Sequence, residues 1–213
     1  MASSEVLIEL VCRHVFFDRE ELTESTLWPD GCMLHTSARD FLVAPADGWL
    51  ITGEPWVEAL IVATRQDLEV EGLPETDGIL LLADGGSIHL NDAGAVAELG
   101  RRVGRDLAPE AFAEILVQWH PPSAAAQFLL RDPGHARRAF DRPDLPEFAG
   151  PVFGQTGDRF TGTFHSARQH AGAVGGALVL DVLAWTVTVP AGAPASWDRR
   201  PVLEGVPLER LAL

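Results

Sequence analysis

The chain has 213 residues, of which 46% are hydrophobic and 22% are charged, as in a folded globular protein rather than a disordered one. All 16 basic residues are arginine, and tyrosine is absent. This composition is typical of a high-GC bacterial genome, and it excludes a lysine Schiff base, a P-loop lysine and a tyrosine acid. The net charge of −15 disfavours nucleic acid as a partner, because phosphate backbones are repelled.

Targeting and redox signals are also absent from the sequence. The first residues carry Glu5 and Glu9 and no basic cluster, so they do not resemble a signal peptide. The longest uncharged apolar stretch, residues 171–180, is too short to span a membrane. Cys12 and Cys32 form no C-x-x-C motif and no disulfide framework. We therefore expect a soluble, cytoplasmic protein with no membrane partner and two free thiols.

The first predicted element is a helix. Residues 5–17 are apolar except for Glu5, Glu9 and Arg13, which recur every four positions and predict the polar stripe of a largely buried helix. The same three residues also share one face of a strand, so a strand is the alternative. A Pro-Asp-Gly turn follows at residues 29–31.

Short apolar runs separated by turn residues then predict the strands of a meander at residues 40–44 and 49–52. Residues 56–64 fit either a helix or a strand. The runs at residues 79–83 and 87–91 flank an Asp-Gly-Gly turn, which predicts a tight β-hairpin.

Helical signals follow the hairpin. One helix is predicted over residues 93–103, and a second begins at Pro109, where proline suits the first turn of a helix. Two prolines at residues 121–122 end the second helix. Ser123 is placed to cap a third helix that contains Phe128.

The last third of the chain is predicted to return to strands. Proline and glycine are frequent over residues 143–157, which indicates an internal boundary or a long loop. Alternating residues 158–168 and the apolar run 177–189 predict strands, and residues 190–207 are predicted to wrap the surface. We therefore expect an α+β fold, a single domain over residues 1–213, with a mostly antiparallel sheet and a central helical segment at about residues 92–140 packed on it.

Acidic residues are concentrated in the first half of the chain. Residues 1–106 have a net charge of −13, and residues 107–213 have a net charge of −2. Part of the excess is a run of carboxylates without any basic residue among them: Asp67, Glu69, Glu71, Glu75 and Asp77. As a strand, the first three would share one face, which is typical either of a protected edge strand or of a docking face for a basic partner.

One pair of residues could carry chemistry. Asp181 is the only charged residue between Ala171 and Ala195, in the strand predicted to be most buried. An antiparallel pairing with an even register sum would place it on the same face as His165, as a carboxylate that orients an imidazole. Arg159 or Arg168 would be the anion anchor of such a site. A structural hydrogen bond within the sheet is the alternative.

No metal or cofactor motif supplements that pair. The histidines do not show the H-x-H or H-x-x-x-H spacing of a metal site, and no glycine-rich phosphate loop is present. Two functions remain open. The first is a non-catalytic acidic protein that engages a partner with a basic surface through its N-terminal half. The second is a cofactor-independent isomerase, cyclase, lyase or hydrolase, or a small-molecule binder, with the His165–Asp181 pair in a pocket of the C-terminal sheet.

Overall fold

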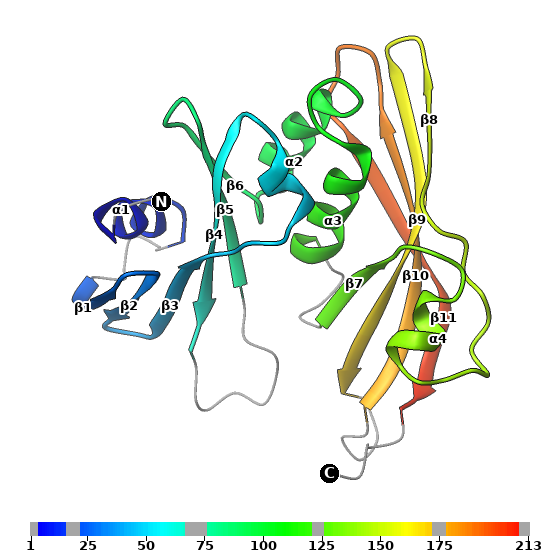
Figure 1. Cartoon of the computed structure of the whole chain (residues 1–213), viewed down its shortest axis with the longest axis horizontal. Coiled ribbons are helices and arrows are strands. Elements are labelled where there is room, and N and C mark those ends of the chain that lie inside the picture. The colour runs from blue at the N-terminus through cyan, green and yellow to red at the C-terminus, as the bar shows by residue number, and fades with distance from the viewer. Residues whose placement is uncertain (1–3, 16–21, 67–75, 121–125, 172–177, 209–213) are drawn as a thin grey trace. The chain divides into compact units, whose positions relative to one another are not determined.

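The computed structural model describes residues 4–15, 22–66, 76–120, 126–171 and 178–208 (Figure 1). The fold is α+β and consists mainly of antiparallel sheets with a few helices, as predicted. The chain divides into two compact units, Met1–Val96 and Ala97–Leu213. Residues 143–157 lie within the second unit.

The first unit contains a six-stranded antiparallel sheet in which each strand pairs with the next strand along the chain. This meander requires only short connections, which agrees with the turn residues that separate its apolar runs. The strands are β1 (Leu22–Trp28), β2 (Gly31–Thr36), β3 (Asp40–Pro45), β4 (Val57–Arg65), β5 (Thr76–Leu82) and β6 (Ser87–His89).

Helix α1 (Ser4–His14) packs on one face of this sheet and confirms the predicted helix. Leu7, Leu10 and Val11, at helical spacing, are buried against apolar side chains of the four middle strands, while Glu5 and Glu9 remain exposed. The core side chains from the sheet are Cys32, Leu34, Phe41, Val43, Ile61, Ala63, Ile79 and Leu81. Cys12 is exposed on the helix and Cys32 is buried, and both are free thiols, as expected.

The strand predicted at residues 49–52 is wrong, because the chain forms a short 3-10 helix, η1 (Leu50–Gly53), before β4. Thr52 bonds back to the Trp49 carbonyl through both its backbone N–H and its hydroxyl, and Ile51 is the one buried side chain. A strand would bury every second side chain on one face, whereas this segment buries only Ile51, which a short helical turn can do. The hairpin of β5 and β6 is confirmed, with Gly85 at φ 83° in its turn.

The second unit contains a sheet with the strand order β11-β10-β9-β7, and β8 also pairs with β9. Its helices include α3, which begins at the predicted proline. The strands are β7 (Ala126–Leu130), β8 (Val152–Thr156), β9 (Arg159–Ala171), β10 (Leu178–Val189) and β11 (Ser196–Pro207). The helices are α2 (Ala93–Leu99), across which the boundary between units falls, η2 (Gly100–Arg102), α3 (Pro109–Trp119) and α4 (His135–Ala139).

The two faces of this second sheet are covered differently (Figure 1). On one face Phe164 and Trp185 stack with their ring centroids 5.7 Å apart, and α3 ends nearby, where Arg199 donates to the carbonyl of His120. The other face packs against α4 and the residues that follow it, in a cluster that includes Ala136, Phe148, Ala167, Leu180 and Val182. Strand β10 is therefore apolar on both sides, as expected for a central strand.

Two predictions in this unit are wrong. Residues 126–130 form strand β7 rather than the third helix, because pairing with β9 satisfies their backbone and buries side chains on alternating faces. Residues 196–207 form strand β11 along β10 instead of wrapping the surface. Pro201 and Pro207 are tolerated there because β11 is an edge strand with register shifts.

Candidate functional site

Asp181 lies at the centre of a polar cluster in the second unit. Its side chain is buried on β10, with 4% of the residue's surface exposed. The Oδ2 atom accepts hydrogen bonds from Arg168 Nη2 and from His170 Nε2 (2.8 Å), both on β9. The Oδ1 atom accepts the backbone N–H of Gly205 on β11 at 2.8 Å. One carboxylate thus connects three adjacent strands.

A bulge in β11 makes the third bond available. Leu180 pairs with Val206 and Val182 pairs with Leu203, so two residues of β11 lie opposite Asp181 alone. Gly205 has a φ of 64°, a left-handed conformation that glycine adopts without strain. Burial raises the pKa of Asp181, but the hydrogen bonds from Arg168, Gly205 and His170 outweigh it and hold the pKa below its usual value.

The predicted His165–Asp181 pair does not form. Strand β9 pairs Arg168 with Asp181 and His165 with Ala184, an odd register sum that places His165 on the opposite face of the sheet. There His165 Nδ1 lies 3.0 Å from the carbonyl oxygen of Ala149, and its ring packs 5.7 Å from Phe148. His170, which the sequence reasoning had not selected, contacts Asp181 instead.

The predicted anion anchors are separated along β9. Arg168 is bonded to Asp181 and has 15% of its side-chain surface exposed. Arg159 is exposed at the other end of the strand, opposite Thr156 of β8. The two arginines are nine positions apart in an extended strand, a distance of about 30 Å, so they do not share a site.

Most of the predicted acidic docking run lies outside the described residues. Asp67, Glu69, Glu71 and Glu75 belong to this part, and Asp77 is the member that the structure places. Asp77 lies on β5 and its Oδ1 atom is 2.8 Å from Nε2 of His89 on β6. A quarter of its side-chain surface, 24%, is exposed.

A second polar cluster joins α1 to the hairpin of the first unit. His14 Nε2 lies 2.8 Å from Ser87 Oγ, and the rings of His14 and His89 are 5.7 Å apart. Burial lowers the pKa of His14, and the charges of His89 and Arg13 lower it further. A neutral imidazole bonded to a hydroxyl is the arrangement of a general base, but Asp77 bonds to His89 and does not orient His14.

This cluster was missed because its members lie far apart in the sequence. Ser87 and His89 alternate on one strand and therefore share a face, which was the available signal. His14 lies four residues after Leu10 and so extends the buried stripe of α1. Within the described parts of the chain, no group of three histidine, cysteine or acidic side chains could hold a metal ion.

A buried polar row crosses the α3 face of the second sheet. Gln127 Nε2 and Trp185 Nε1 both donate to Ser166 Oγ at 2.8 Å. The other amide atom of Gln127, Oε1, is buried and has no hydrogen-bond partner among the described residues. Because an amide can be turned end for end, one of its two polar atoms stays unpartnered in either orientation.

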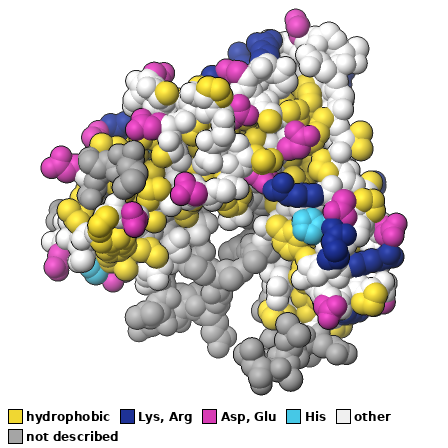
Figure 2. Space-filling view, in the orientation of Figure 1, with side chains coloured by type: hydrophobic (Ala, Val, Ile, Leu, Met, Phe, Trp, Pro, Cys, Tyr) yellow, Lys and Arg dark blue, Asp and Glu magenta, His cyan; other side chains and the backbone are white. Residues whose placement is uncertain are grey.

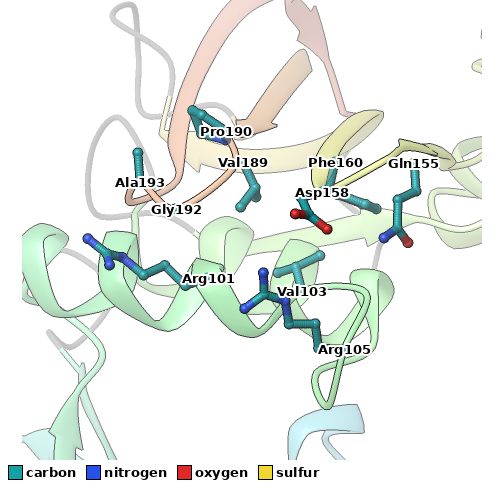
Figure 3. A pocket seen from close by; sticks show the side chains of 10 residues that line it. All are labelled: Arg101, Val103, Arg105, Gln155, Asp158, Phe160, Val189, Pro190, Gly192 and Ala193. Atoms are coloured by element: carbon teal, nitrogen blue, oxygen red, sulfur yellow. The ribbon is translucent and has the colours of Figure 1, made fainter.

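A small hollow of about 100 Å³ opens on the second unit between the turn after η2 and the turns that end β8 and β10 (Figure 3). Its floor is apolar, with Val103, Phe160 and Val189, and Arg105 and Asp158 line it from opposite sides. Ligand pockets for drug-sized molecules measure roughly 300–1,000 Å³. The hollow is too small to enclose such a molecule.

Comparison with known proteins leaves the site without a family context: the chain matches no family model, no curated protein and no solved structure. Among the described residues, no helix has the length and apolar character needed to cross a membrane.

Proposed function

We propose that this chain is a non-catalytic binding protein that engages a cationic protein partner through its N-terminal unit. The observation that supports this proposal is the division of charge between the two units. Residues 1–96 carry 18 acidic and 4 basic residues, a net charge of −14, whereas residues 97–213 carry 13 acidic and 12 basic residues, a net charge of −1. Solubility requires net charge but no particular distribution, so confinement to one unit favours recognition.

Several carboxylates of the N-terminal unit are available to a partner. Five of them are exposed and form no ion pair within the described part of the chain: Glu5, Glu24, Asp30, Asp47 and Glu58. By contrast, seven arginines of the second unit form ion pairs with carboxylates of that unit: Arg101, Arg102, Arg131, Arg137, Arg138, Arg142 and Arg168. On the face shown in Figure 2, acidic side chains of the N-terminal unit outnumber its arginines. Such a surface speeds encounter with a basic protein and repels an acidic one.

The experiment compares two variants that lose the same charge. In the first, the five exposed carboxylates of the N-terminal unit are changed to their amides. In the second, five exposed carboxylates of the other unit, which form no ion pair with any described residue, are changed in the same way: Glu110, Asp141, Asp158, Asp198 and Glu204. Binding of a fluorescent peptide of alternating arginine and serine is measured over a series of salt concentrations.

We expect the first variant to lose at least about tenfold in affinity and to show a flatter salt dependence, while the second retains the wild-type affinity. An equal loss in both variants would mean that net charge alone attracts the peptide, and the proposal would fail. It would also fail if the unaltered chain did not bind the peptide at low salt.

A further inference from the structure

Strand β1 is an edge strand that buries almost nothing. It lies at one end of the six-stranded sheet, where its outer edge pairs with no other described strand (Figure 1). Six of its seven residues are exposed, among them Leu22 at 36% and Leu27 at 51%. A strand gains most of its stability from the side chains it buries, so β1 gains little from its own unit.

The two faces of β1 differ in chemistry. Leu27 is paired with the buried Cys32 of β2, so it extends the apolar face on which α1 packs. Glu24 is paired with His35 on the other face, and His35 Nδ1 lies 2.9 Å from Asp40 Oδ1 of β3. A strand added next to β1 would therefore meet the apolar side chain of Leu27 on one face and the carboxylate of Glu24 on the other.

Strand β1 has few of the features that keep natural edge strands from pairing with other strands. Such edges usually carry prolines, lysines or bulges that prevent pairing. The corresponding edge strand of the second unit, β11, has Pro201, Pro207 and two register shifts. Strand β1 has one irregularity, between Leu22 and Glu24, and then pairs regularly with β2 as far as Trp28. Its outer edge is therefore open to backbone pairing over the run that holds Glu24 and Leu27.

We infer that the cationic partner binds β1 by strand addition, as an extended segment in which basic and apolar residues alternate. This inference rests on the proposed function, which supplies the charge of the partner, and adds the mode of recognition. Backbone hydrogen bonds along β1 give affinity, and the alternating side chains give specificity. A basic side chain beside Glu24 and an apolar one beside Leu27 form favourable cross-strand pairs. A second copy of the chain would bring another unit of net charge −14 to the same edge and is repelled.

The experiment uses a short peptide of alternating arginine and valine and two N-methylated forms of it. In each form every second backbone nitrogen is methylated: the two phases carry the methyl groups either on the arginine nitrogens or on the valine nitrogens. All three peptides carry the same charge and side chains, but in a strand one phase blocks the donors that face β1 and the other leaves them free. Affinity for the full chain is measured by calorimetry, and protection of the β1 amides is followed by hydrogen exchange.

We expect the unmethylated peptide to bind and to protect β1, and one methylated phase to bind at least about tenfold more weakly than the other. Leu27→Ser should weaken binding, while Leu50→Ser, at a similarly exposed leucine of η1, should not. Equal affinity for all three peptides would overturn strand addition and leave charge-driven binding intact. Binding of none of them would overturn both. Self-association of the chain that Leu27→Ser abolishes would assign the edge to a second copy and overturn the inference.

Discussion

His170 Nε2 and Asp181 Oδ2 lie 2.8 Å apart on adjacent strands of the second sheet, and Arg168 donates to the same oxygen. The remaining oxygen of the carboxylate accepts the backbone N–H of Gly205. All of these bonds are made within the sheet by a residue that is 4% exposed. The hydrogen bonds of Asp181 therefore link the bulge of β11 to β10 and β9, and we assign this residue a structural role.

Replacing Asp181 with asparagine should lower the free energy of unfolding by about 1–3 kcal/mol, because Arg168 loses an ionised partner in a largely buried position. Urea unfolding of the two proteins measures this difference. Glu204→Gln is the control, since that neighbouring carboxylate of β11 is exposed and should change stability by less than about 0.5 kcal/mol. Equal stability of D181N and the unaltered chain would contradict the structural role.

The two histidines with a depressed pKa should make stability fall in mild acid. Burial is the main cause of the lowered pKa of both His14 and His135. The unfolded chain then binds protons more readily than the folded one. The stability that the two neutral imidazoles contribute is therefore fully present above the usual histidine pKa of 6.5, and it is lost as pH falls through the lower pKa of the folded protein. Between about pH 7.5 and about pH 5.5, His14→Gln should reduce the loss of protection of α1 amides, measured by hydrogen exchange. His135→Gln should act only on α4. If H14Q lost as much protection of its α1 amides in acid as the unaltered chain, protonation of His14 would not be the cause.

Gly31 at the start of β2 should not accept even a methyl group. A Cβ atom there would lie 2.5 Å from the carbonyl oxygen of Val43 and 3.0 Å from the indole nitrogen of Trp28. Gly31→Ala is expected to destabilise the protein by about 1–3 kcal/mol, measured by thermal or urea unfolding. At Gly53, nothing lies within 4 Å of the corresponding position, so Gly53→Ala should be nearly neutral. Similar values for the two variants would show that the backbone around Gly31 adjusts.

Local signals were sufficient for several elements of this fold. The polar stripe of Glu5, Glu9 and Arg13 predicted α1, and the proline at position 109 predicted the first residue of α3. The Asp-Gly-Gly turn predicted the hairpin of β5 and β6. Each of these patterns depends on residues that are close together in the sequence, so the segment itself is enough to predict the element. The charge of the N-terminal unit was also visible, because it is a property of composition.

Tertiary structure decided the partners of the polar residues. The sequence placed Asp181 in a buried strand, but only the register between β9 and β10 selected Arg168 and His170 over His165, since a shift of one residue moves every side chain to the other face. The contact of His14 with Ser87 required α1 to dock on the sheet across 73 positions of sequence. Residues 126–130 form a strand because their backbone pairs with β9, a contact that lies outside the segment itself. Long-range pairing overrides local preference because an unpaired buried backbone group costs more than a residue's propensity contributes.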